Sequence, residues 1–526
     1  MRYGFNCKMV IEKILHLNEI NFFPELFLGT GILYLTVYCV FIAYNNESGS
    51  LLVQNSFELL GTLVLSMVFL LIINDLTVEF VFTSFNNCFS SDFLSVIAKL
   101  SVIGSSIICV LLIKDYILAQ KINSFEYILL ILFAILGLLL LCSANDLITA
   151  YLAIELQSLA FYMLAAFKKT SSHSVESGIK YFILGSFSSG LFLWGASLIY
   201  AVAGTVNFEN LKDLFLFEQS PSYLREHLLT PGIIQSNLNF VYGSVPLIAL
   251  IFIFISLFFK LSLAPFHVWS PDIYEGSASS STFLFAVVPK ISFFVLIVRL
   301  TYHSFPALID TWQNYVLFLV ILSITAGAVA GLEQRKIKSL LAYSSISHMG
   351  YILMSFSTDS FEIFQMIFFY ILLYTMFTAG VWSMFLLIRL NRCYQKKQNK
   401  DLGDLTLLKK SNSGLAFLFM VLLLSVASLP PMVGFLTKFG VFLVAVQNGL
   451  YVIVILGILL GVISTFYYLR IVKILYFEPV LVGRLYYPIK TQKIIFVVLN
   501  VYLIIFLFAN PSFVFLLSHK IGLLSI

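Results

Sequence analysis

The stretch IFIFISLFFKLSLAPFHVW, residues 251–269, indicates the fold class most directly. It is an apolar run that carries Lys260 at its end and Pro265 five residues later. Proline removes the hydrogen bond to the carbonyl four residues earlier, so this helix is predicted to break inside an apolar environment. A break of this kind frees backbone carbonyls beside a buried ammonium. The stretch therefore predicts a broken membrane helix in which Lys260 handles an ion. The alternative is that Lys260 extends its ammonium to the membrane surface.

A second stretch, SLPPMVGFLTKFG at residues 428–440, repeats this pattern further along the chain. Its consecutive prolines, Pro430 and Pro431, must interrupt a helix, and Lys438 follows seven residues after Pro431. The two broken helices are the seventh and twelfth predicted spans. The second broken helix comes five helices after the first. Because five is an odd number, the second copy runs through the membrane in the opposite direction. Inverted repeats with broken helices are typical of secondary transporters, which place ion sites at the breaks.

The composition of the whole chain fits a membrane protein. Of its 526 residues, 60% are hydrophobic and 11% are charged, and the mean hydropathy is +0.98. A soluble domain carries about 25% charged residues, so this chain is predicted to be an all-α polytopic membrane protein. Apolar runs bounded by Gly, Pro and charges predict about fourteen transmembrane helices. These spans are 22–44, 57–73, 94–113, 125–142, 147–167, 178–203, 241–269, 276–303, 312–333, 337–356, 361–389, 413–449, 450–473 and 493–517.

These spans group into four parts. Residues 1–124 form an N-terminal three-helix segment, 125–303 a first five-helix repeat, 304–473 a second, inverted repeat, and 474–526 a C-terminal helix. Most of the 31 basic residues fall in loops leading from odd to even spans, whereas Lys99 and Arg299 stand at helix ends on the opposite side. Because basic loops stay on the side of synthesis, both termini are predicted to face away from the cytoplasm or matrix.

The sequence predicts no cofactor, metal or nucleic-acid site in this chain. The net charge of +5 is small, and the six cysteines are scattered singly, without the close pairs of zinc or iron–sulfur sites. Neither a phosphate-binding loop nor a dinucleotide-binding glycine motif occurs. The energy that this protein uses must therefore come from a gradient or from a partner.

Glu155 lies in the middle of the fifth span. The successive spacings between Tyr151, Glu155, Ser158 and Tyr162 are four, three and four residues. These four residues therefore share one helical face. An ionisable residue at a helix centre opposes insertion by about 2.5–3.5 kcal/mol, and such residues usually line ion or proton pathways. We interpret Glu155 as a functional carboxylate, and the alternative is a structural ion pair with a neighbouring helix.

Two further candidates lie in the eighth and tenth spans. Lys290 follows Pro289 in AVVPKISFFVL, where it either acts on a proton or caps a carbonyl freed by the kink. His348 lies in IKSLLAYSSISHMGYILMSFS, a helix too polar to face lipid. Histidine can relay protons near neutral pH, so we predict that His348 connects Lys290 with Lys438. A packing histidine is the equally supported alternative.

The chain resembles the subunit 2 branch of the antiporter-like membrane subunits of respiratory complex I, the NADH dehydrogenase. Five segments spread over roughly residues 130–470 carry the resemblance: ANDLITAYLAIELQSLAFYMLAAF, KLSLAPFHVWSPDIYEGS, VVPKISFF, IKSLLAYSSISHMGYILM and LSVASLPPMVGFLTKF. In the subunit 4 branch the ion of the broken twelfth helix is glutamate, so Lys438 argues against that branch.

The resemblance implies proton translocation driven by NADH oxidation and ubiquinone reduction in other subunits. Glu155 would be the family's acid of the fifth helix, and Lys260, Lys290 and Lys438 its lysines of helices seven, eight and twelve. Glu155 and Lys260 would form a pair whose separation loads or releases a proton. Lys290 and His348 would pass protons laterally, and Lys438 would be the terminal site. No redox centre is expected in this chain.

The resemblance also implies partners and a location. NADH, FMN, iron–sulfur clusters and ubiquinone would belong to partner subunits, and membrane lipids would surround the bundle. The expected location is the mitochondrial inner membrane, with both termini on the intermembrane-space side, or else a bacterial plasma membrane. Three other interpretations stay open: a cation/proton antiporter subunit, a chloroplast-type ferredoxin-dependent plastoquinone reductase subunit, and a structural scaffold.

Overall fold

The fold is described from a computed structural model of the chain. It describes residues 22–45, 50–77, 81–120, 125–218, 245–357, 362–392, 395–398, 401–406, 408–478, 485–486 and 491–525.

Helices dominate these residues, as the apolar runs predict. The α-helices are α3 (Phe23–Asn45), α4 (Ser50–Asn74), α5 (Phe93–Ala119), α6 (Glu126–Ser143), α7 (Leu147–Ala166), α8 (Ser172–Ala203), α9 (Phe208–Glu218), α12 (Val245–Lys260), α13 (Trp269–Gly276), α14 (Ser279–Val287), α15 (Pro289–Val298), α16 (Ile309–Glu333), α17 (Ile337–Met354), α18 (Glu362–Leu387), α19 (Leu408–Ser411), α20 (Ser413–Val426), α21 (Val433–Gln447), α22 (Tyr451–Tyr476), α23 (Thr491–Ala509) and α24 (Ser512–Ser525). Short 3-10 turns η1 (Asp75–Thr77), η3 (Pro306–Leu308), η4 (Ser355–Ser357) and η5 (Leu402–Leu405) and a π-helical turn η2 (Arg299–Ser304) complete the helical set.

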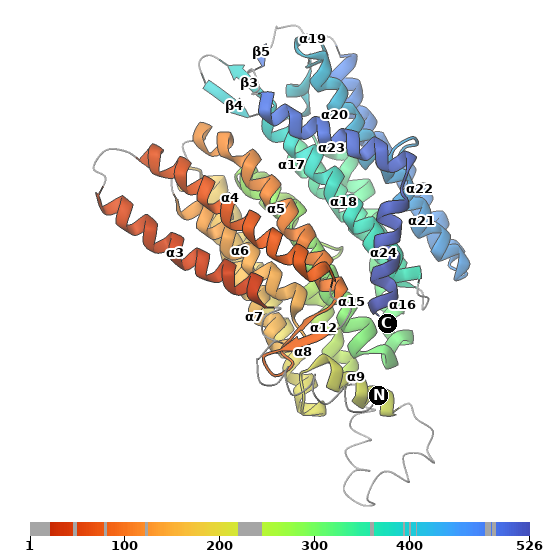
Figure 1. The fold of residues 1–526 in the computed structure, drawn as a ribbon. Coiled ribbons are helices and arrows are strands. Elements are labelled where there is room, and N and C mark those ends of the chain that lie inside the picture. Colours follow the sequence, from red (N-terminus) through yellow and green to blue (C-terminus); the bar gives the residue numbers. More distant parts are fainter. Residues whose placement is uncertain are drawn as a thin grey trace, which may run out of the picture.

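Strands are few and short among the described residues. Strands β1 (Phe82–Ser84) and β2 (Phe89–Ser91) form an antiparallel hairpin in which Thr83 pairs with Ser90. Strands β3 (Arg389–Arg392), β4 (Gln395–Gln398) and β5 (Leu485–Tyr486) form a second antiparallel sheet in the order β4-β3-β5. Figure 1 shows the second sheet at one end of the bundle.

The helices form one bundle with α15 at its centre. Figure 1 shows the red-to-yellow helices α3 to α8 on one side and the cyan-to-blue helices α17 to α24 on the other. Helix α15 contacts α5 and α6 of the first group and α18 of the second. Its residues Pro289–Val298 are all buried. A helix that is buried all round must be apolar on every face, and PKISFFVLIV departs from this rule chiefly at Lys290.

Both predicted helix breaks are confirmed, and they have the same backbone form. Helix α12 ends at Lys260, Ser262 takes a φ of 60°, and its N–H bonds to the Phe259 carbonyl. The amide of the next residue, Leu263, bonds five residues back, to Phe258. After α20, Ser428 also takes a φ of 60° and bonds to Ser425, and Leu429 bonds five residues back, to Leu424.

The structure differs from the sequence prediction at the C-terminus. The sequence predicts one final span over 493–517, but α23 and α24 meet there at an angle of 77°. The bend falls at Asn510 and Pro511, because proline lacks the amide that would continue the helix. Helix α24 then packs against both α18 and α5. The predicted C-terminal helix of residues 474–526 is therefore a bent pair.

Every predicted span coincides with at least one described helix. Ten of the described helices are long and apolar enough to cross a membrane, or eleven if the bent pair forms one span. The sequence predicts fourteen spans, and the two broken spans account for part of the difference between the two numbers. These broken spans contain the short apolar helices Val245–Lys260, Ser413–Val426 and Val433–Gln447, which are not among the ten longer helices.

Candidate functional site

Three lysines and a histidine are buried inside the bundle. The exposed fraction is 8% for Lys260, 4% for Lys290, 8% for Lys438 and 2% for His348. A buried ammonium is strongly destabilising unless neighbouring groups replace the lost hydration. At each of these lysines a tyrosine provides the replacement.

Lys290 begins a row of polar contacts between α15, α18 and α17. Its Nζ donates to the Tyr374 hydroxyl at 2.7 Å and lies 4.8 Å from the centre of that ring. The Tyr374 ring is 5.5 Å from the His348 ring, centre to centre. His348 Nδ1 then shares a hydrogen bond of 2.9 Å with the Tyr370 hydroxyl. The structure thus links Lys290 to His348 through Tyr374 of α18, by a hydrogen bond on one side and a ring contact on the other, and Tyr370 of the same helix holds His348.

Lys438 lies over the face of a third tyrosine. Its Nζ is 4.6 Å from the centre of the Tyr351 ring, a cation–π arrangement that partly replaces hydration. Tyr351 stands three residues after His348 in α17, so the two side chains share a helical face. The charges of Lys438 and Lys290 both act on His348. His348 therefore lies within electrostatic reach of both lysines.

Lys260 contacts α7 through a tyrosine rather than through the predicted carboxylate. Its Nζ donates to the Tyr162 hydroxyl at 3.3 Å. Glu155 is half-buried on the same helical face, two turns before Tyr162, and its charge acts on Lys260. Glu155 and Lys260 form no ion pair within 4.0 Å among the described residues. In this structure the hydrogen-bond partner of Lys260 on α7 is therefore Tyr162 and not Glu155.

Contacts on the far side of the helix break hold the end of α12, which carries Lys260. Trp269, the first residue of α13, donates its indole N–H to the Phe259 carbonyl at 2.9 Å. The Trp269 ring also stacks on Tyr181, with ring centres 5.0 Å apart. Tyr181 in turn meets Tyr162 edge to face at 4.8 Å. These contacts fix the end of α12, and with it Lys260, against α7 and α8.

Tyr370 and Tyr374 belong to the site although the sequence did not single them out. The signal was present, because the two tyrosines lie four residues apart in α18 and so share one face. Aromatic residues are abundant in membrane helices, and this chain has 27 tyrosines, so the spacing alone is a weak indication.

The sequence places two further cations, Lys99 and Arg299, at helix ends beside loops. The structure puts them in an environment that the sequence did not predict. Both are buried with 3% exposure, and both form ion pairs, Lys99 with Glu25 and Arg299 with Asp92. Sequence position cannot show this burial, because the partner of each cation comes from a distant segment.

Groups of this kind can hold and pass protons. Lysine and histidine bind a proton reversibly, and a tyrosine hydroxyl can accept one hydrogen bond while donating another. The row from Lys290 through Tyr374, His348 and Tyr370 therefore contains alternating proton carriers. It offers neither a nucleophile with an activating base nor a row of metal ligands.

Comparison with known proteins assigns the chain to a family. Residues 144–464 match the family model described as NADH:quinone oxidoreductase/Mrp antiporter, TM. NADH-ubiquinone oxidoreductase chain 2 of Marchantia polymorpha is 36% identical over 504 residues, which cover 95% of this chain and 97% of that protein. NADH-quinone oxidoreductase subunit N of Paramagnetospirillum magneticum is 40% identical over 399 residues, covering 76% of this chain and 78% of its own length.

Solved structures show the same fold. A chain of respiratory complex I from Thermus thermophilus has a TM-score of 0.75 at 25% identity, and the match covers 94% of this chain and 99% of that one. A chain of the Mrp complex from Dietzia has a TM-score of 0.77 at 16% identity and 96% coverage of both chains. The expected antiporter-like membrane fold is therefore confirmed, and the chain belongs to the family of NADH-ubiquinone oxidoreductase chain 2 and its bacterial counterpart, NADH-quinone oxidoreductase subunit N.

Proposed function

We propose that this chain is a proton-translocating membrane subunit of a respiratory NADH:quinone oxidoreductase. Glu155, Lys260, Lys290, His348 and Lys438 are its proton-handling residues, and Tyr162, Tyr351, Tyr370 and Tyr374 hold them in place. One observation carries the proposal: the buried contacts that join Lys290 to Tyr374 and His348 to Tyr370 inside a membrane bundle.

The physical mechanism rests on charges that act on one another in a medium of low dielectric. A proton on Lys290 or on Lys438 disfavours a second one on His348, because like charges repel strongly away from water. Loading one end of the row therefore favours release at the other. Helix motion that changes the contact between Lys290 and Tyr374 would alter which site holds the proton.

Glu155 would control the first lysine at longer range. Its negative charge favours the protonated form of Lys260, and Tyr162 supplies the hydrogen bond between their helices. A movement of α7 relative to α12 would change the distance from carboxylate to amine. Such a movement would load or unload Lys260 without bringing the two groups into direct contact.

The oxidation of NADH and the reduction of ubiquinone would be carried out by partner subunits that hold the FMN and iron–sulfur clusters. The subunit would lie in a mitochondrial inner membrane with both termini on the intermembrane-space side, or in a bacterial plasma membrane. The two broken helices support an arrangement in two inverted repeats, 125–303 and 304–473, because their backbones share one hydrogen-bond pattern.

Replacing Lys260 tests the proposal most directly. In the assembled complex in membrane vesicles, we expect Lys260→Ala to reduce proton pumping per NADH oxidised, because the ammonium next to Tyr162 is lost. Lys180→Ala is the matched control, since Lys180 is an exposed residue of neighbouring α8 that pairs with Glu176 and Asp272. Undiminished pumping in Lys260→Ala, with normal NADH oxidation, would contradict the role of Lys260.

Two alternative functions predict different experimental results. A free-standing cation/proton antiporter would purify without the flavin and iron–sulfur absorbance of the complex. A structural scaffold would show reduced assembly in Lys290→Ala or Lys438→Ala, whereas proton translocation predicts normal assembly with impaired pumping.

A further inference from the structure

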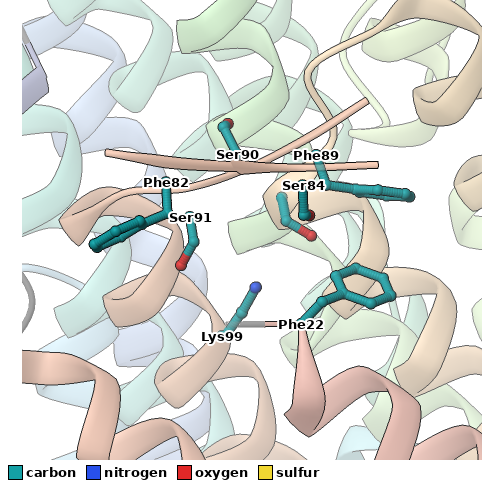
Figure 2. Close-up of a pocket in the computed structure, with 8 residues that line it drawn as sticks. Phe22, Phe82, Ser84, Phe89, Ser90, Ser91 and Lys99 are labelled. Atoms are coloured by element: carbon teal, nitrogen blue, oxygen red, sulfur yellow. The ribbon is translucent and has the colours of Figure 1, made fainter. Parts of the chain in front are cut away.

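Charged contacts outside the proposed proton row lie at both ends of the bundle. Figure 2 shows the end where α5 begins, with Lys99 projecting toward β1 and β2 and lining a small cavity together with four serines. The ion pair of Lys99 with Glu25 joins α5 to α3, so it stays within the N-terminal three-helix segment. Helix α13 lies at the opposite end, because the amide of Ser279, shortly after α13, donates to the Tyr116 hydroxyl in the last turn of α5 at 3.3 Å.

Helix α13 follows the break beside Lys260 and is held closely to the helices before it. Its first residue, Trp269, donates to the Phe259 carbonyl, directly before Lys260. At its last residue, a Cβ added to Gly276 would lie 2.7 Å from the His173 carbonyl oxygen of α8, which shows how tightly the two helices pack. The position of α13 is therefore linked to that of Lys260.

Two carboxylates on one face of α13 pair with lysines on different sides. Asp272 and Glu275 are three residues apart, so they are neighbours on the helix surface. Asp272 pairs with Lys180 of α8 at 3.2 Å, a contact within the first proposed repeat. Glu275 pairs with Lys336, the residue directly before α17. This second pair crosses to the second proposed repeat.

Two further contacts join α13 to the second proposed repeat. Lys338, in the first turn of α17, donates its Nζ to the carbonyl of Ser277, the residue after α13, at 2.7 Å. Tyr274 meets Trp382 of α18 edge to face, with ring centres 6.0 Å apart, and both side chains are buried. Helices α17 and α18 carry the histidine and the tyrosines of the proton row. Helix α13 thus connects the helix of Lys260 to both of these helices.

We propose that α13 couples Lys260 to His348, and that Glu275 is a positioning residue for this coupling through its ion pair with Lys336. Coupling between distant sites is carried by packed side chains and ion pairs that join rigid elements. A change at the break beside Lys260 moves α13, and the pair passes this movement to the start of α17 and so to His348. No proton passes through Glu275, whose carboxylate stays ionised. This inference rests on the proposed proton translocation and adds a positioning residue to it.

The exposure of the pair separates its positioning role from a role in stability. The side chains of Lys336 and Glu275 are 50% and 43% exposed. An ion pair in water contributes little to stability, whereas charge complementarity fixes the register between two surfaces. Removing one charge should therefore leave the complex assembled while loosening the contact between α13 and α17.

Proton pumping per NADH oxidised by the assembled complex in vesicles tests this role. In Glu275→Gln and in Lys336→Gln we expect pumping to fall by about twofold or more, a change typical of residues that carry coupling. The matched control is Asp272→Asn, which removes a carboxylate from the same face of α13 but from the pair with Lys180. Pumping in this control should match the wild type.

Reversing both charges supplies a rescue. We expect the double variant Glu275→Lys with Lys336→Glu to recover pumping, because the attraction between α13 and α17 is restored. The reversed charges also suit the helix dipoles, since a cation is favourable near the end of α13 and an anion at the start of α17. The midpoint of thermal disassembly should stay at the wild-type value in all of these variants.

Four results would overturn the proposal. These are undiminished pumping in Glu275→Gln, an equal loss in Asp272→Asn, a charge-reversed variant that pumps no better than the single variants, and a midpoint that falls together with pumping. Failure of the proposed function is distinguished by Lys290→Ala: undiminished pumping in that variant refutes the row itself, whatever the Glu275 variants show.

Discussion

At the scale of single residues, tyrosine hydroxyls and rings determine how the three buried lysines of the candidate site are held. Lys260 and Lys290 each donate to a hydroxyl, and Lys438 lies over a ring. A hydroxyl lowers the cost of burying an ammonium without neutralising it, whereas a carboxylate would fix the proton on the lysine. In the proposed function, such neutral partners would leave these lysines able to release their protons.

Removing one hydroxyl should separate packing from proton transfer. Tyr374→Phe keeps the ring beside His348 and removes the acceptor of the 2.7 Å hydrogen bond from Lys290. Because positioned acid–base groups typically contribute a hundredfold or more, we expect proton pumping to fall by at least about tenfold. Pumping per NADH oxidised in vesicles measures the effect. Tyr502→Phe, at an exposed residue of α23, should match the wild type, and normal pumping in Tyr374→Phe would contradict the role of this hydroxyl.

At the scale of elements, close helix contacts set the geometry of the site. Helix α8 approaches α7 where Gly185 faces Tyr162, and a Cβ added at Gly185 would overlap the Tyr162 hydroxyl oxygen. This oxygen is the one that accepts the hydrogen bond from Lys260. The contact between α7 and α12 therefore depends on the absence of a side chain in a third helix.

This close approach predicts a loss of function from one added methyl group. Gly185→Ala should displace the Tyr162 hydroxyl, break its contact with Lys260 and reduce pumping several-fold, since small misplacements of catalytic groups have large effects. Gly190→Ala on the same helix is the control, because a Cβ there meets nothing within 4 Å. Vesicle pumping assays on both variants, with blue-native gels to verify assembly, make the comparison. Equal pumping in the two variants would argue against this geometry.

At the scale of the whole molecule, one buried ion pair joins two helices of the three-helix segment, and a second ion pair and the bent C-terminus hold that segment to the rest of the bundle. The Glu25–Lys99 pair joins α3 to α5, and the Arg299–Asp92 pair joins the end of α15 to the residue preceding α5. At the C-terminus, Lys493 Nζ donates to the Leu112 carbonyl of α5 at 3.1 Å, and Lys520 lies over the Phe93 ring. Helix α5 is thus held by segments from both ends of the chain.

Breaking one buried pair should destabilise this arrangement more than removing the pair altogether. Lys99→Met leaves the Glu25 carboxylate buried without its cation, and a loss of about 3–5 kcal/mol is typical of such changes. Adding Glu25→Gln should recover part of the loss, because no uncompensated charge remains. The midpoint of thermal disassembly of the detergent-solubilised complex is the measurement. Lys180→Met, at an exposed ion pair, should change this midpoint little. A double variant less stable than Lys99→Met would contradict this expectation.

Local chemistry in the amino-acid sequence is enough to predict the architecture and most of the candidate site. Apolar runs must become helices in lipid because backbone groups there need internal partners, and Pro265 and Pro431 must break those helices. The high cost of burying charge likewise singles out Glu155, Lys260, Lys290 and Lys438 from their positions in apolar runs. Each of these inferences uses only the residues of one continuous segment of the sequence.

The contacts between these groups, by contrast, depend on the tertiary structure. The sequence predicts a pair between Glu155 and Lys260, but the folded chain places the Tyr162 hydroxyl next to the amine. It also brings Tyr374 to Lys290 across 84 residues of sequence and Lys99 to Glu25 in another part of the bundle. Packing fixes these contacts, because the rotation of each helix about its axis depends on its neighbours. No local pattern contains that information.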